Sequence, residues 1–193
     1  MAIAQTKLEL LLNQENLNEE NINQVTQAQN ALRRLSRLSA SLGTLTKIDN
    51  KEFDVTEDVD LSVVLKGIAD EFKELISLKN LTLQLSIMDS VVIKSDPTLI
   101  EMLLSNLINN AIRHNLESGF IEIELSNQFF SIKNSGPDLE VQPMELFERF
   151  KKSNQSDQST GLGLAIVKQI CELNGFKIGY TQSDQKHEIQ IEF

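Results

Sequence analysis

Apolar positions in the first fifty residues recur at alternating steps of three and four, the spacing of one face of a helix. A short run at 2–12 is separated by the Asn/Glu-rich stretch 13–21 from a longer periodic segment at 19–47, and Gly43 is the first glycine. The stripe of the longer segment is Val25, Ala28, Leu32, Leu35, Leu42 and Leu45. We predict a helical hairpin that pairs with a second copy, because an isolated hairpin buries only one stripe per helix. The alternative is packing against the rest of its own chain.

From residue 52 the pattern changes to mixed helix and strand. We predict strands at 52–60, 81–87, 91–95, 120–126, 129–135, 176–182 and 187–193, and helices at 61–78, 97–114 and 163–174. Asp96 followed by Pro97 is a helix start signal. Helices and strands do not alternate strictly, so we expect an α+β two-layer sandwich, with helices on one face of a mainly antiparallel sheet. The predicted domains are 1–51 and 52–193.

Composition and charge exclude several classes of ligand. The net charge is −10, and the Lys and Arg residues are not clustered beyond pairs. This argues against nucleic acid or an anionic membrane as the main ligand. The single cysteine, Cys171, lies among apolar neighbours and is predicted to be buried, in a reducing compartment.

Three asparagines stand within five positions of the helix predicted at 97–114. Asparagine is a poor helix former, so Asn106, Asn109 and Asn110 need a compensating role. Asn106, Asn110 and Arg113 share one helix face. Amide oxygens can ligate Mg²⁺, and an arginine can balance phosphate charge. The alternative is a solvated polar face.

Two glycines, Gly161 and Gly163, precede the helix predicted at 163–174. The first turn of a helix has unpaired N–H groups that suit an anionic oxygen, and glycine lets a phosphate approach closely. The alternative is a core helix that Ser159 or Thr160 caps and Gly175 ends.

These motifs together resemble those of sensor histidine kinases, whose superfamily also contains gyrase, Hsp90-type chaperones and MutL repair proteins. The segment "NLINNA" at 106–111 resembles the family's N box, and "LFERF" at 146–150 resembles its F box. Residues 160–163 resemble the second glycine box. The motifs occur in the family's order over 52–193, and the resemblance implies a Bergerat-type ATP-binding fold.

The resemblance also implies roles for single residues. Asn110 would be the main protein ligand of Mg²⁺ with Asn106 assisting, and the backbone of 161–163 would cradle phosphates. Residues 151–160 would form a mobile lid. The residues implied to contact ATP are Asn106, Asn110, Arg113, His114, Asn134, Gly136, Phe150, Lys151, Lys152, Thr160, Gly161, Leu162, Gly163 and Leu164.

The first glycine box departs from the family pattern Asp-x-Gly-x-Gly. The equivalent stretch is "NSGPD", in which Gly136 is kept, Asn134 replaces the aspartate that binds the adenine amino group, and Asp138 replaces the second glycine. Asn134 can still accept through its amide oxygen, in a neutral and weaker bond. The loop also fits a plain turn at the end of a strand.

The phosphoacceptor histidine of the family has no counterpart. We expect a fragment cut just after that histidine, with an acceptor-less relative as the alternative. His187 lies in a predicted closing strand, so we reject it as an acceptor, and His114 occupies an N-box position.

Taken together, the sequence predicts the catalytic core of a sensor histidine kinase that binds ATP and Mg²⁺. The family transfers the γ-phosphoryl group to a histidine of the dimerisation helix and then to an aspartate of a response regulator receiver domain. We expect no autophosphorylation by this chain, a homodimer weakened by truncation, and a cytoplasmic location, with the parent protein anchored in the inner membrane. The alternatives are a pseudokinase or adaptor dimer and, less favoured, an ATP-driven clamp.

Overall fold

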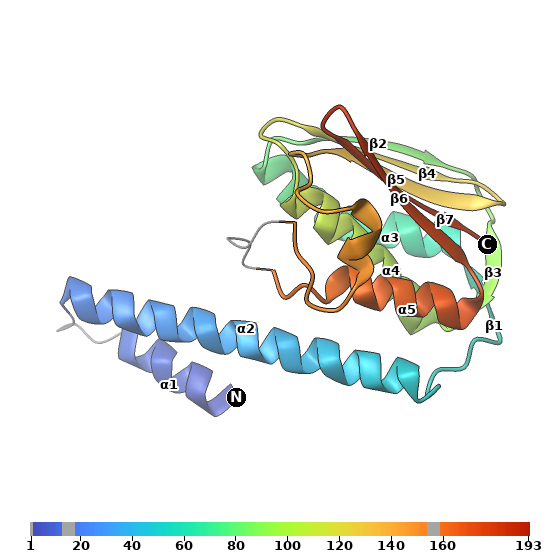
Figure 1. Cartoon of the computed structure of the whole chain (residues 1–193). Coiled ribbons are helices and arrows are strands. Elements are labelled where there is room, and N and C mark those ends of the chain that lie inside the picture. The colour runs from blue at the N-terminus through green and yellow to red at the C-terminus, as the bar shows by residue number, and fades with distance from the viewer. Residues whose placement is uncertain (1, 13–17, 154–158) are drawn as a thin grey trace. The chain divides into compact units, whose positions relative to one another are not determined.

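The computed structural model describes residues 2–12, 18–153 and 159–193 (Figure 1). The chain divides into two compact units, Met1–Gly43 and Thr44–Phe193. The boundary lies inside the long helix α2 (Glu19–Asp49). None of the described helices is long and apolar enough to cross a membrane.

The first unit consists of α1 (Ala2–Leu12) and the part of α2 that ends at Gly43, as the apolar spacing predicts. The Asn18 side chain caps α2 by accepting a hydrogen bond from the Asn21 amide at 2.8 Å. Several large apolar side chains are exposed on both helices. They are Ile3, Leu10, Leu11, Ile22, Leu35 and Leu42.

The second unit contains a five-stranded sheet in the order β2-β4-β5-β7-β6. Its strands are β2 (Thr82–Ile87), β4 (Phe120–Leu125), β5 (Phe129–Ser135), β6 (Lys177–Ser183) and β7 (Lys186–Glu192). Within this sheet the β2–β4 pair is parallel and the other three pairs are antiparallel. The helices α3 (Leu61–Leu78), α4 (Pro97–Arg113) and α5 (Gly163–Asn174) lie on one face of the sheet (Figure 1). The predicted α+β sandwich is confirmed.

Two neighbouring strands do not form the hairpin that their sequence spacing favours. β3 (Val92–Ser95) is not part of the five-stranded sheet. It pairs antiparallel with the short β1 (Glu57–Asp60) in a separate two-stranded sheet. β2 pairs in parallel with β4 instead. The 3-10 helix η1 (Pro143–Phe147) lies within the connection that leads from β5 to α5.

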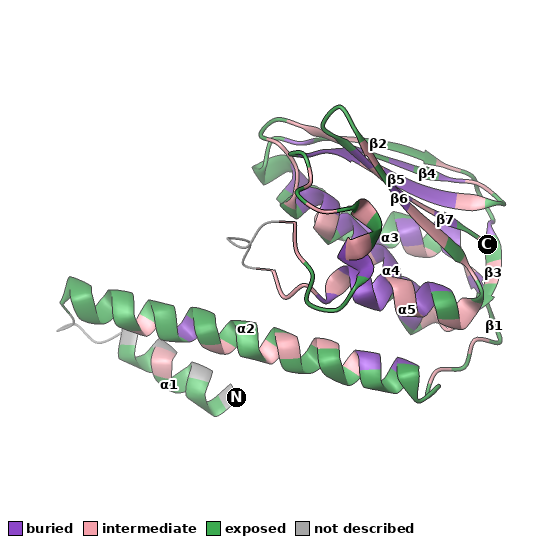
Figure 2. Cartoon of the chain, in the orientation of Figure 1, coloured by how far each residue is buried: buried purple, intermediate pink, exposed green. Residues whose placement is uncertain are grey.

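The core lies between the sheet and its helices (Figure 2). Alternate residues of β4, namely Ile121, Ile123 and Leu125, are at most 2% exposed and meet the apolar stripe of the helices. On α4 that stripe includes Leu99 and Leu103, as predicted. The apolar face of α4 therefore packs against the core, and the asparagines lie on the remaining, less buried faces of the helix.

Helix ends are set by short signals. Asp96 caps α4 by accepting from the amides of Thr98 and Leu99, with Pro97 at the first helical position, as predicted. Gly175 ends α5 with φ of 76°, a left-handed conformation that glycine adopts without steric cost.

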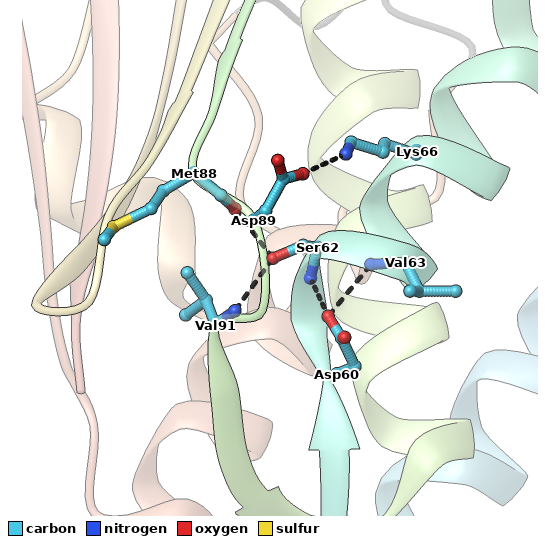
Figure 3. Close-up of polar contacts among 7 residues, drawn as sticks. All are labelled: Asp60, Ser62, Val63, Lys66, Met88, Asp89 and Val91. Atoms are coloured by element: carbon cyan, nitrogen blue, oxygen red, sulfur yellow. Dashed lines mark hydrogen bonds and ion pairs between the residues drawn. The ribbon is translucent and has the colours of Figure 1, made fainter.

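A buried serine fastens the β2–β3 loop to α3 (Figure 3). The Ser62 hydroxyl donates to the Met88 carbonyl at 2.8 Å and accepts from the Val91 amide at 3.0 Å. Beside it Lys66 pairs with Asp89, and the ammonium group holds the pKa of that carboxyl below its usual value. Loop and helix are therefore joined by both buried and exposed contacts.

The last turns of α2 belong to the second unit. Leu45 and Ile48 are 1% and 3% exposed. The Arg149 guanidinium, next to the F-box phenylalanine, donates to the Asp49 carboxylate at 2.9 Å. The end of α2 is thus tied to the F box.

Candidate functional site

The three asparagines of α4 have different environments. Asn106 and Asn110 are half-buried, whereas Asn109 is exposed. The Asn106 side chain donates to the Met102 carbonyl at 2.7 Å, and its amide oxygen lies 3.0 Å from the position that a Cβ on residue 163 would take. Asn106 therefore lies directly against the start of α5. Within the described ranges, the side-chain amide of Asn110 makes no hydrogen bond, so its side-chain oxygen can accept a hydrogen bond or bind a cation.

The other end of the α4 polar face meets the first glycine box. His114 is the C-cap residue of α4, and its carbonyl oxygen lies 2.9 Å from the position that a Cβ on Gly136 would take. Arg113, one residue earlier, is exposed. From Asn106 to His114 an α-helix rises roughly 12 Å, so the two glycine boxes flank a polar helix face of that length.

Asn134 stands at the end of β5 and is 7% exposed. Its amide nitrogen donates to the Ser135 carbonyl at 2.8 Å. No described residue donates a hydrogen bond to its side-chain oxygen. This oxygen is therefore an available acceptor on a largely buried residue, the kind of group that an adenine amino group requires.

Gly161 is needed both for its backbone conformation and for its size. Its φ is 67°, and a Cβ there would lie 2.8 Å from the carbonyl carbon of Phe150. The Phe150 amide donates to the Gly161 carbonyl at 2.8 Å. Phe150 itself has φ of 67° and is 57% exposed, so this hydrogen bond helps hold a non-glycine residue in a costly conformation.

The start of α5 has no side-chain cap. Leu162 occupies the N-cap position and its side chain makes no cap hydrogen bond, so neither Ser159 nor Thr160 is the N-cap residue, whereas Gly175 ends the helix as predicted. The side chains of Leu162 and Leu164 are buried, so only their backbone can contact a ligand. The uncapped N–H groups and the positive end of the helix dipole suit an anion.

The segment predicted as a lid is described only in part. Residues 154–158 lie outside the described residues, and Lys152 and Thr160 are half-buried. The Lys151 ammonium pairs with Glu145 at 2.9 Å and more loosely with Glu148 at 3.8 Å. The Glu145 contact raises the pKa of Lys151 and lowers that of Glu145, so both stay charged at neutral pH.

A cluster that the sequence did not reveal joins the end of α4 to the sheet. The Asn115 amide donates to the carbonyls of Ala111 and Phe120, and its oxygen accepts from the Ser135 hydroxyl. The Ser135 hydroxyl in turn accepts from the Phe120 amide at 3.1 Å. This cluster fixes the N box relative to the first glycine box. Its hydrogen bonds join residues up to twenty positions apart, and the periodicity of the sequence does not reveal such links.

His187 is also missed as a site residue. It lies in β7 and is 5% exposed, in keeping with its rejection as a phosphoacceptor, yet it contacts the first glycine-box loop. Its register partner across the sheet is Asn134. This pairing depends on the strand order, which the sequence pattern does not reveal.

Comparisons with known proteins show the family to which the chain belongs. Residues 95–193 match the family described as histidine kinase-, DNA gyrase B- and HSP90-like ATPase. The chain is similar to the heme sensor protein HssS of Staphylococcus aureus, with 36% identity over 164 residues that cover 78% of this chain and 34% of that protein. It therefore spans about a third of the length of the curated relatives it matches.

Solved structures give the same result. The catalytic domain of histidine kinase ThkA superimposes with a TM-score of 0.62 at 27% identity, covering 71% of this chain and 93% of that one. Histidine kinase AdeS of Acinetobacter baumannii has the same fold, with a TM-score of 0.68 at 24% identity over 100% of this chain and 93% of that one. The chain belongs to the histidine kinase-, DNA gyrase B- and HSP90-like ATPase family. Within that family it carries the ATPase domain of a sensor histidine kinase, as the sequence motifs predict.

Proposed function

We propose that this chain binds Mg²⁺-ATP along the polar face of α4. The observation that carries the proposal is that the two glycine boxes lie against opposite ends of that face, at Asn106 and His114. The Asn134 side-chain oxygen is the acceptor on the adenine side, and the uncapped start of α5 lies on the phosphate side. These donors and acceptors fit a nucleoside triphosphate.

The residues also fit the cation. Asn110 Oδ1 is the main protein ligand, and Asn106, at i−4 on the same face, assists it. Mg²⁺ supplies neutralisation of the phosphate charge when bound. Arg113 adds a second positive charge from the end of α4.

Mg²⁺-ATP in this site serves transfer of the γ-phosphoryl group to a histidine of a dimerisation helix, and from there to an aspartate of a response regulator receiver domain. The chain has two histidines, His114 and His187. His187 is buried in β7, and His114 belongs to the nucleotide site. The acceptor is therefore a histidine that these 193 residues do not include, and incubation with γ-labelled ATP leaves the chain unlabelled.

A second candidate function is a non-catalytic adaptor dimer. It is favoured by the altered first glycine box, in which Asn134 and Asp138 replace an aspartate and a glycine. In that case the exposed apolar side chains of α1 and α2 mediate assembly while the nucleotide site is idle.

Calorimetric titration with ATP, with and without Mg²⁺, separates the two functions. The wild type shows saturable binding that requires Mg²⁺, and Asn110→Ala weakens it at least about tenfold because a ligand of the cation is lost. The matched control is Asn109→Ala, the exposed neighbour on the same helix, which leaves the affinity unchanged. Absence of binding by the wild type under both conditions would favour the adaptor.

A further inference from the structure

We infer that His187 is a positioning residue of the nucleotide site, which holds the altered first glycine-box loop in its adenine-binding conformation. The inference rests on the proposed function, because it assigns the same loop to the adenine base. It explains how the loop keeps a defined shape although Pro137 and Asp138 stand in the family's glycine-rich segment.

The His187 ring has a polar partner on each nitrogen. Nε2 lies 3.0 Å from the Pro137 carbonyl oxygen, and Nδ1 lies 3.1 Å from the Tyr180 hydroxyl. A carbonyl oxygen only accepts, so Nε2 carries the proton and donates to Pro137. In the neutral ring the Tyr180 hydroxyl then donates to Nδ1, and both nitrogens are satisfied.

The loop is also in steric contact with the ring. A Cβ on Gly136 would lie 2.5 Å from His187 Cδ2, so only glycine allows the backbone to approach this closely. On its other side the same Cβ position is 2.9 Å from the His114 carbonyl. Gly136 is thus enclosed between His187 and the C-terminus of the N-box helix, which fixes the distance between them.

The residue that replaces the second glycine is held from the same hairpin. Gln182 on β6 donates from its side-chain amide to the Asp138 carboxylate, and Gln182 is the register partner of His187. The Gly136 amide donates to the Gln185 carbonyl at 2.8 Å. Three successive loop residues are therefore bound by the β6–β7 hairpin, with His187 the buried member at 5% exposure.

The contact extends to the F box. The Tyr180 ring packs edge-on against His187 with centroids 6.0 Å apart, and against Phe147 with centroids 6.1 Å apart. Tyr180 and Phe147 are 8% and 2% exposed. His187 therefore links the first glycine-box loop to the F box through the packed rings of Tyr180 and Phe147.

Substitution of His187 tests the role. His187→Leu fills the space but leaves the Pro137 carbonyl without its donor, while His187→Gln keeps an N–H donor near the same place. Ile189→Val, two residues along the same strand and 4% exposed, is the control for a mild loss of packing without a contact to the loop. For each variant, the dissociation constants of ATP and GTP and the exchange rate of the Gly136 amide hydrogen are measured.

We expect His187→Leu to weaken ATP binding about tenfold and GTP binding less than about twofold, because GTP shares the phosphates but not the base. The Gly136 amide then exchanges faster in the ligand-free protein. His187→Gln restores most of the preference for ATP, and Ile189→Val leaves it unchanged.

Two results overturn the inference alone: wild-type ATP preference in His187→Leu, or equal losses for ATP and GTP with unchanged Gly136 exchange. A wild-type chain that binds neither nucleotide overturns the proposed function, and the inference with it.

Discussion

At the scale of single residues, the contact between Phe150 and Gly161 is the most constrained point of the site. Two residues eleven positions apart both have φ of 67°, and one backbone hydrogen bond joins them. Such conformations persist only where surrounding structure enforces them. The glycine box is thus required for the geometry of the chain itself, in addition to any phosphate.

Gly161→Ala tests this requirement. The added Cβ would lie within 2.9 Å of backbone atoms of Phe150 and Lys151, and the left-handed conformation disfavours alanine. We expect the free energy of unfolding to fall by about 1–3 kcal/mol and ATP binding to weaken, as measured by urea denaturation and calorimetry. The control is Gly67→Ala in α3, where a Cβ has open space, and this variant should gain up to about 1 kcal/mol. Equal stability of the two variants would contradict the assignment.

Two buried groups, the Cys171 thiol and the Tyr180 hydroxyl, make the free energy of unfolding depend on pH in the alkaline range. Burial raises the pKa of the Cys171 thiol from 9.0 to about 12, and raises that of the Tyr180 hydroxyl from 10.0 to about 12. Between each group's usual pKa and its pKa in the folded protein, the unfolded chain loses a proton that the folded chain keeps. The free energy of unfolding therefore falls as the pH rises from 9 toward 12. Cys171→Ala should make this fall shallower by up to about 1.4 kcal/mol per pH unit. Urea midpoints at several pH values measure it, and an unchanged slope would show that Cys171 is not buried as a thiol.

At the scale of elements, Ser62 joins α3 to the β2–β3 loop, and its replacement gives a clear expectation. Ser62→Ala leaves the Val91 amide and the Met88 carbonyl without their buried partner, at a cost of about 1–3 kcal/mol in the free energy of unfolding. Val63→Ala, next to it and 65% exposed, should change stability by less than about 0.5 kcal/mol. Chemical denaturation compares the two, and a similar loss in both would mean that the hydroxyl is dispensable.

The elements that could be predicted from sequence are those whose signals are local. The cap and proline at Asp96 and Pro97 fix the start of α4, and alternation fixes the strands, so both appear where expected. The pairing of β2 with β4 could not be predicted, because which strands become neighbours depends on the packed helices. The site shows the same difference between local and long-range signals. The N box and the glycine boxes could be predicted because each is a contiguous motif, whereas the contact of His187 with Pro137 joins residues fifty positions apart and could not.

At the scale of the whole molecule, the exposed apolar side chains of the hairpin predict self-association. Leu35 is 58% exposed and Leu42 is 42% exposed on α2. We expect a concentration-dependent dimer in sedimentation velocity experiments, and Leu35→Asp should shift it toward monomer because it places a charge in the apolar contact. Thr26→Asp, nine positions away and thus on the opposite side of the helix, adds the same charge without this effect. Equal shifts by both variants would assign the change to net charge.

Helix α2 runs unbroken for 31 residues, yet the boundary between the two compact units falls within it, directly after Gly43. No atom outside the residue's local backbone lies within 4 Å of where a Cβ would stand, so packing does not require glycine here. Glycine disfavours the helical state by about 1 kcal/mol relative to alanine, so helical hydrogen bonds open most readily around this residue. Position 43 is therefore where intrinsic propensity favours the helical conformation of α2 least. A single methyl group there would favour the helical conformation of α2 by about 1 kcal/mol, without adding or removing a side-chain contact.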